Sequence, residues 1–192
     1  MSLGNRHSAG TIWLPTGNPE TTNITPTDFN SMGGQPGDLG LAFEAGNPSR
    51  SYQRVQLDSG ATAATPAGVV VAGDLMYWKD KSVYLVTNDS RFAMNGASAA
   101  GAFRNYAAGV IRLAATAGNI VDIVQRGQSV PCADGGNTFT AGETVFAENT
   151  TTDSALDRTA VGTYPGVTVL GIARGAAANG LVNVDLDIPY AQ

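Results

Sequence analysis

Short apolar runs separated by glycine-rich turns constrain this chain more than any other feature. Residues 52–58 alternate apolar and polar side chains, which is typical of a half-buried strand. Residues 75–87 form two such runs around Asp80 and Lys81 and predict a β-hairpin. Strands at this spacing predict an all-β fold, either a β-sandwich or a barrel. Further runs of the same kind lie at 68–72, 108–113, 120–125, 144–147, 168–173 and 181–188.

The segments between these runs are predicted to be turns and loops. Residues 127–137 contain three glycines and a proline, and we expect a loop there. Residues 93–105 are rich in Ala and Gly and fit a short helix or a loop equally well. Cys132 is the only cysteine, so neither a disulfide within the chain nor a cysteine metal site is possible. We expect Cys132 to be an unreactive residue beside a turn, because no basic neighbour lowers its pKa.

Two stretches of the sequence resemble each other. Gly109 and Gly171, Arg112 and Arg174, and Gly118 and Gly180 are pairs separated by the same 62 residues. Upstream, residues 71–77 (VAGDLMY) resemble residues 140–146 (TAGETVF). The pattern predicts an internal two-fold repeat, with halves at about 66–125 and 136–188.

Residues 1–60 differ from the rest and are predicted to be an extended Pro/Gly-rich N-terminal arm, followed by a β domain over 61–192. Five prolines interrupt this stretch, and no helical or alternating period persists in it. Large apolar residues nevertheless recur, as a disordered tail would usually not show. We therefore expect an arm that is ordered by contact with other surfaces; a flexible tail with scattered apolar residues is the alternative. The candidate partner-binding residues are Ile12, Trp13, Leu14, Phe29, Leu39 and Phe43.

Charge is scarce. Charged residues make up 14% of the chain, the net charge is −5, and Lys79 and Lys81 are the only lysines. Nucleic-acid binding needs clustered basic residues to neutralise phosphates, so this composition argues against it. A charge-poor surface suits a protein whose faces are covered by neighbours better than a free monomer. The first ten residues lack the apolar core of a signal peptide, and no run of about 20 apolar residues could span a bilayer. We therefore expect a soluble protein made in the cytoplasm.

Catalytic residues are hard to find. The only histidine, His7, lies in the predicted arm, so a Ser-His-Asp or Cys-His system and a histidine metal site are improbable. Glycoside hydrolysis needs two facing carboxylates, and Asp122, Asp185 and Asp187 lie on predicted strands, but no feature selects a pair. We expect these carboxylates to cap turns or to meet Arg112 and Arg174.

Two further expectations follow from single segments. Residues 134–137 (DGGN) could supply oxygen ligands to Ca²⁺, but an Asn/Gly turn fits them better. Tyr77 and Trp78 are either core residues or interface anchors. Because no catalytic or metal-binding motif is found in the sequence, we expect the chain to be non-enzymatic and to need no cofactor.

The repeated module resembles the small capsid decoration, or cement, proteins of tailed bacteriophages. The residues that carry the resemblance are Ala72-Gly-Asp74, Ala108-Gly-Val110, Ala114 to Gly118 with the strand 120–124, and the second copy through Ile188. The resemblance covers residues 66–188. Its elements are a strand opened by "AGD", a "G-[VI]" strand, an "A-A-x-G" turn and a "V-x-[IV]" strand.

This resemblance implies a structural virion protein on the capsid surface, synthesised in the host cytoplasm. Its partners would be the major capsid protein and other copies of itself in a dimer or trimer, with no membrane partner. It would stabilise the joints between major capsid subunits. The alternative is a phage tail or baseplate component or a host-recognition β module, with a sugar groove near Trp78. A carboxylate-based hydrolase is a third possibility.

Overall fold

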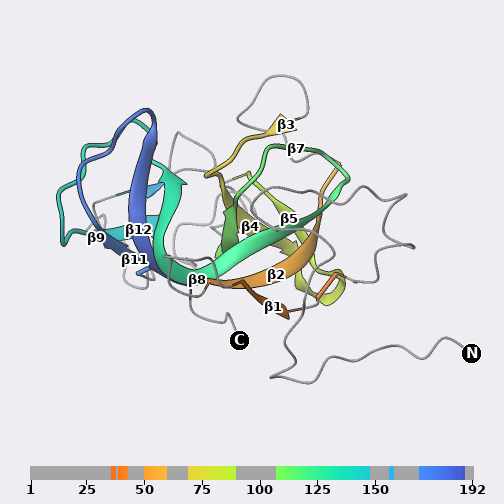
Figure 1. Cartoon of the computed structure of the whole chain (residues 1–192). Helices are drawn as coiled ribbons and strands as arrows, with labels where there is room; N and C mark the ends of the chain where they lie inside the picture. Colours follow the sequence, from red (N-terminus) through yellow and green to blue (C-terminus); the bar gives the residue numbers. More distant parts are fainter. Residues whose placement is uncertain are drawn as a thin grey trace, which may run out of the picture.

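The computed structural model describes residues 36–37, 39–42, 50–59, 69–89, 107–147, 156–157 and 169–188 (Figure 1). Within these ranges the protein is all-β, as predicted, with twelve strands, one 3-10 turn and no α-helix. The strands are β1 (Leu39–Ala42), β2 (Arg50–Leu57), β3 (Val69–Val70), β4 (Leu75–Asp80), β5 (Leu85–Thr87), β6 (Ala107–Ile111), β7 (Ala115–Thr116), β8 (Ile120–Ala133), β9 (Thr144–Ala147), β10 (Leu156–Asp157), β11 (Gly171–Ala173) and β12 (Leu181–Asp187), and the turn η1 is Lys81–Val83.

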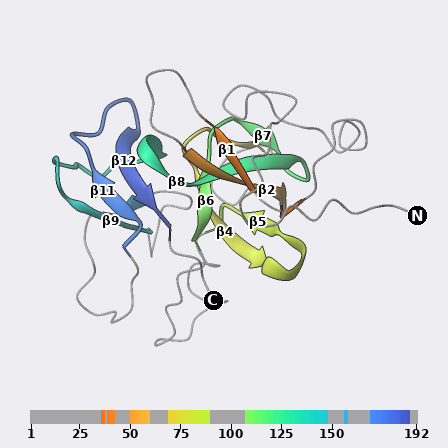
Figure 2. The same ribbon diagram turned by 60° about the horizontal axis from the view of Figure 1, so that its bottom comes forward.

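Five strands close into a barrel. In the order β2-β5-β4-β6-β8 each strand is hydrogen-bonded to the next, and β8 pairs again with β2 (Figure 2). All of these pairs are antiparallel except β2 and β5, which run parallel. Of the two predicted architectures, the structure therefore adopts the barrel. Each of the five strands is paired on both sides, so the closed ring has no free sheet edge.

The barrel interior is filled by alternating side chains of its strands. Residues with an inward side chain recur at every second position, as strand geometry requires. Burying them removes apolar surface from water, which is the main term that stabilises the barrel. This interior cluster consists of Val55, Leu57, Val70, Met76, Trp78, Val86, Ala108, Ile111, Ala115, Val121 and Ile123.

The strand β8 connects the barrel to a second sheet. Its first half pairs with β2, and its second half pairs with β12, so one strand runs through both parts (Figure 1). The second sheet has the order β8-β12-β11-β9-β10. Its inner face packs on the outer face of the barrel, and the shared core includes Tyr52, Tyr77 and Val110 from the barrel and Val145, Val182 and Val184 from the second sheet. β3 and β7 form a separate two-stranded sheet, which contributes Val70 and Ala115 to the interior cluster of the barrel.

The prediction of a loop at 127–137 is wrong for residues 127–133, which belong to β8. Pro131 is tolerated there because it faces Asn183 of β12 at a pair without ladder hydrogen bonds, so its missing N–H removes none. Asn183 O accepts instead from Arg174 N–H (2.8 Å), and Pro131 O accepts from Arg112 Nη1 (3.4 Å). Cys132 accordingly lies in a strand with no exposed surface, rather than beside a turn.

The two turns that the sequence alignment pairs have the same local structure. In the first, Asp74 N–H donates to Val71 O (3.2 Å), and Val71 N–H donates to the Asp74 carboxylate (3.1 Å). In the second, Glu143 N–H donates to Thr140 O (3.2 Å), and Thr140 N–H donates to the Glu143 carboxylate (2.6 Å). An acidic residue at the fourth position thus closes each turn on itself.

The strands that follow each turn are also paired alike. Gly73 N–H donates to Ile111 O and Gly142 N–H donates to Ala173 O, both at 2.8 Å. Both glycines have a positive φ, 97° and 89°, which a side chain would disfavour. A two-fold repeat of the whole halves 66–125 and 136–188 stays a prediction, because parts of both halves lie outside the described residues.

The predicted arm of residues 1–60 lies largely outside the described residues. Where the structure describes it, residues 39–42 and 50–57 are strands of the main sheet, and β2 is a wall of the barrel. The strand-forming part of the chain therefore begins before residue 61. None of the described helical segments could cross a membrane.

Candidate functional site

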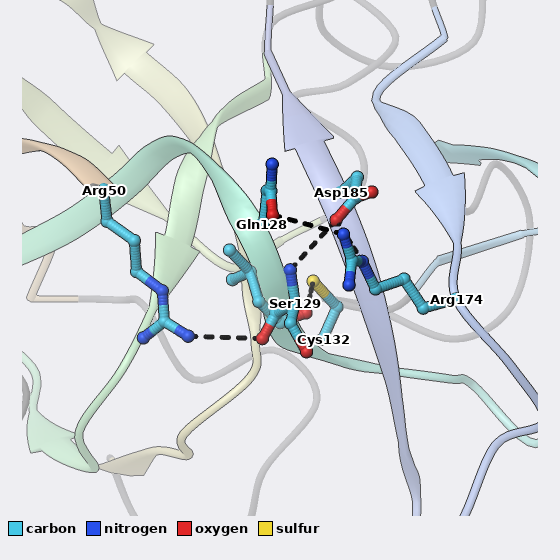
Figure 3. Close-up of polar contacts among 7 residues, drawn as sticks. Arg50, Gln128, Ser129, Cys132, Arg174 and Asp185 are labelled. Atoms are coloured by element: carbon cyan, nitrogen blue, oxygen red, sulfur yellow. Dashed lines mark hydrogen bonds and ion pairs between the residues drawn. The ribbon is translucent and has the colours of Figure 1, made fainter. Parts of the chain in front are cut away.

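A polar network surrounds the bend of β8 (Figure 3). Residues Gln128 and Ser129 face the single residue Asp185 of β12, which makes a β-bulge. Ser129 takes a left-handed backbone conformation with φ 52°, which is uncommon for a residue other than glycine. Its N–H donates to Asp185 Oδ1 (3.1 Å), and its carbonyl accepts from Arg50 Nη2 (3.2 Å). Side chains from β12 and β2 thus hold the bend from both sides.

Asp185 is itself held by Arg174, which follows β11. Arg174 Nε donates to Asp185 Oδ1 (2.6 Å), and Arg174 Nη2 donates to Gln128 Oε1 (3.3 Å). The hydrogen bond from Arg174 lowers the pKa of Asp185, and the Ser129 N–H contributes in the same direction. The carboxylate is therefore ionised at neutral pH. The prediction that Asp185 meets Arg174 is confirmed.

This network does not have the properties of a catalytic pair. A general acid in glycoside hydrolysis needs a raised pKa, whereas the pKa of Asp185 is lowered. The nearby Asp187 binds Arg126 (Nε to Oδ1, 2.8 Å). In the described ranges no group of three His, Cys, Asp or Glu residues could hold a metal ion. The polar groups at the bend are used to fix the main chain.

Asp122 pairs with a residue that sequence reasoning missed. Arg54 Nε and Nη2 donate to Asp122 Oδ1 (3.0 Å) and Oδ2 (3.1 Å), and the side chains are 2% and 5% exposed. The two residues face each other directly across β2 and β8. The expected partners of the strand carboxylates were Arg112 and Arg174, and Arg54 was not among them. The available signal was a charged residue within each of two predicted strands, Arg54 in 52–58 and Asp122 in 120–125.

The segment 134–137 forms a turn, as predicted. Asp134 Oδ1 accepts from Gly136 N–H (2.8 Å), and Asp134 O accepts from Asn137 N–H (2.9 Å). A carboxylate that caps its own turn is typical of an Asx turn. The Asp134 carboxylate therefore has a structural role in this turn.

Cys132, Tyr77 and Trp78 are core residues. Burial raises the pKa of the Cys132 thiol to about 12, so it carries almost no thiolate at neutral pH. Tyr77 is fully buried between the sheets, and Trp78 is 6% exposed in the barrel interior. A buried indole cannot stack on a sugar, so the groove expected near Trp78 for a host-recognition module has no platform there.

Leu39 is the predicted partner-binding residue that the structure describes. It begins β1 and is 38% exposed. Ile12, Trp13, Leu14, Phe29 and Phe43 lie outside the described residues, as does His7.

Gly37, two residues before Leu39, is fixed to the barrel. A Cβ added to Gly37 would lie 2.5 Å from Cζ of Tyr84, so the ring of Tyr84 rests directly on the Gly37 backbone. Gly37 N–H also donates to Arg54 O (2.7 Å). Tyr84 ends η1 with φ 55° and packs edge-on against Trp78, with ring centroids 6.3 Å apart. Gly37 therefore cannot accept a larger residue without displacing this ring.

No known family model matches the sequence, and no curated protein is similar to it in sequence. Among solved structures, the chain is similar to the head fiber gp8.5 N base in bacteriophage phi29. The TM-score is 0.39, the sequence identity is 14%, and the match covers 71% of this chain and 92% of the other. A TM-score and an identity this low do not establish a common fold, and the proposals below depend on this chain's own residues.

Proposed function

We propose that this chain is a non-enzymatic structural protein of a tailed-phage virion, which binds the outside of the capsid and stabilises joints between major capsid subunits. The observation that carries the proposal is the shared structure of the two "AG[DE]" turns. The residues of the repeated module resemble those of decoration proteins, and both copies of its "AG[DE]" turn close through the same hydrogen bonds. These hydrogen bonds fix the main chain of both turns, which suits a protein that acts by binding.

The charged groups support the same interpretation. Asp185 holds the bend of β8, Asp122 neutralises a buried Arg54, and Asp134 caps a turn. Each of these three carboxylates is bound to the main chain or to an arginine, which supports a structural role for it.

The mechanism we propose is the addition of buried area across a joint. A standard protein–protein interface buries about 1,600 Å² in total. An N-terminal segment that lies over neighbouring subunits would enlarge this area, at the cost of the entropy lost on ordering. In this proposal Leu39, together with Ile12, Trp13, Leu14, Phe29 and Phe43, contacts the major capsid protein, and the chain acts as a dimer or trimer.

The test is sedimentation or mass photometry of the purified chain, alone and mixed with expanded heads of its phage that lack it. Stoichiometric binding to the heads supports the proposal, and the mass of the free protein gives its oligomeric state. A stable free oligomer without affinity for heads contradicts it. That outcome would favour a tail, baseplate or host-recognition component instead.

A further inference from the structure

The chain reverses direction at residues 178–181, between β11 and β12. Ala178 N–H donates to Leu181 O (2.8 Å), and Leu181 N–H donates to Ala178 O (3.1 Å). The two residues between them, Asn179 and Gly180, both have a positive φ, 54° and 79°. Two positive φ angles are typical of a type I′ turn, in which Asn-Gly is a strongly preferred pair. The sequence of this turn therefore suits its backbone conformation.

The same pair is chemically labile. The main-chain nitrogen of Gly180 can attack Cγ of Asn179, because glycine has no side chain that hinders the approach. As the new N–Cγ bond forms, the Gly180 nitrogen gives its proton to solvent and the side-chain nitrogen leaves as ammonia. Water then opens the five-membered succinimide ring at either carbonyl and yields aspartate or isoaspartate. The overall reaction consumes water and releases ammonia.

Both reacting groups are accessible. Asn179 and Gly180 are exposed. Among the described residues, no hydrogen bond uses the Gly180 N–H or the Asn179 side chain. A Cβ added to Gly180 would have no neighbour within 4 Å, so the structure leaves this side of the turn open to solvent.

The other asparagines that the structure describes lack this combination. Each of them precedes a residue with a side chain, which hinders attack by the following nitrogen; they are Asn88, Asn119, Asn137 and Asn183. Asn88 also has no exposed surface. A second Asn-Gly pair, residues 95–96, lies outside the described residues.

The folded turn controls the reaction. In the left-handed conformation ψ is about +47°, which places the following nitrogen on the far side of Cα from the side chain. Ring closure needs this nitrogen beside Cβ, so Asn179 must rotate about its Cα–C bond. That rotation breaks the two hydrogen bonds between Ala178 and Leu181. The reaction therefore proceeds from an opened turn, whose population is set by local unfolding.

This turn also holds two other parts of the molecule. Gly180 O accepts from Asp134 N–H (3.0 Å), directly after β8. The side chain of Leu181 lies against Gly73, where an added Cβ would be 2.6 Å from Leu181 Cδ2. Isoaspartate adds a methylene group to the main chain, so a two-residue turn that contains it cannot keep the same hydrogen bonds. Its formation would disturb both contacts.

We propose that Asn179 is a site of spontaneous deamidation, at which isoaspartate formation loosens the start of β12 from the end of β8 and from Gly73. The proposal is independent of the proposed capsid function, because it depends only on this turn and its neighbours.

The first test follows the purified chain as it ages in mildly alkaline buffer. Trypsin cleaves after Arg174 and releases residues 175–192, which carry both Asn179 and Asn183; residues 95–96 fall in a different peptide, 92–104. Tandem mass spectrometry locates the replacement of an amide by a carboxyl group. We expect Asn179 to react at least about tenfold faster than Asn183, a difference of ~1.4 kcal/mol in activation free energy. Equal rates at the two positions overturn the proposal.

Urea tests the role of the turn. We expect Asn179 to react faster in the urea-unfolded chain than in the native chain, because unfolding frees rotation about the Cα–C bond. Asn183 in the same peptide reports any general effect of urea on the reaction. An equal rate at Asn179 in both states would show that the folded turn does not restrain the reaction, and would overturn control by turn opening.

Hydrogen exchange tests the structural consequence. Ion-exchange chromatography separates the isoaspartate form from the fresh chain, and N179D is the matched control, since it carries the same new charge without the extra methylene group. We expect the Asp134 amide to exchange at least about tenfold faster in the isoaspartate form than in N179D. Equal exchange in the two proteins would show that the turn does not hold the end of β8, and would overturn the proposed loosening.

Discussion

Gly109 of β6 lies directly against the carbonyl oxygen of Val124 in β8. A Cβ added to Gly109 would lie 2.8 Å from that oxygen and 2.9 Å from Ile123 Cδ1. Gly171 of β11 stands in the same relationship to Asp185 of β12, where an added Cβ would overlap the carbonyl oxygen. Both glycines are thus needed for the close approach of two strands, rather than for a positive φ. The two aligned glycines thus have the same structural reason.

We expect G109A and G171A to destabilise the protein by about 1–3 kcal/mol each, because the obstructing atoms belong to the main chain of a neighbouring strand and cannot turn away. Urea unfolding followed by circular dichroism measures this change. G175A is the matched control, since an added Cβ there has no neighbour within 4 Å. Equal stability of G171A and G175A would contradict the close approach.

The buried pair of Arg54 and Asp122 gives a second prediction. Removing one partner leaves an uncompensated charge, because the side chains are only 2% and 5% exposed. We expect D122L alone and R54M alone each to lower the free energy of unfolding by about 3–5 kcal/mol, and the two changes together to lower it far less than the sum of the single changes. Urea unfolding of the four proteins tests this. Additive losses would show that the two side chains act independently.

Local patterns were sufficient to predict part of the strands and turns. The hairpin 75–87 is β4 and β5, and the paired "AG[DE]" segments form matching turns, because alternation and glycine position act within a few residues. The long β8 was not predictable in the same way. Its second half contains Gly127 and Pro131, which usually end a strand. It continues as a strand because β12 pairs with it and because Gly73 O accepts from Ala133 N–H (2.8 Å).

Side-chain pairs across the sheet were even harder to predict from the sequence. Arg54 and Asp122 are 68 residues apart, and only the register between β2 and β8 brings them together. Closure of the barrel sets that register, and no local pattern encodes it. For the same reason Arg54 was not among the arginines expected to meet the strand carboxylates.

The bend of β8 should be sensitive to acid. The hydrogen bond from Arg174 holds the pKa of Asp185 below its usual value of about 3.9. A carboxyl group with a lowered folded-state pKa adds stability above its unfolded pKa, and this stability is lost as pH falls through the folded value. We expect D185N to be less stable than wild type at pH 7, and the difference to disappear as pH falls from about 3.9 through the lowered folded-state pKa of Asp185. The difference is expected to be small, because Arg174 and Asp185 are partly exposed.

Urea midpoints of wild type and D185N from pH 2 to pH 7 measure this effect. The comparison is needed because the pKa of Asp80 is also lowered, by hydrogen bonds from Ser82, and contributes to the acid sensitivity of both proteins. Arg126 and Asp187 lie on the adjoining strands and remain unchanged in the variant. A pH-independent difference between the two proteins would mean that the ionised form of Asp185 is not what holds Ser129.

The thiol of Cys132 should be unreactive in the folded protein. It has no exposed surface, its Sγ–H donates to Val130 O (3.3 Å), and burial raises its pKa to about 12. We expect no reaction with an aromatic disulfide reagent at pH 8 during the time in which the urea-unfolded protein reacts completely, because only thiolate attacks. C132A gives the background of the assay. Rapid reaction of the native protein would mean that β8 opens at Cys132, and that the second half of this strand is not held in the shared core.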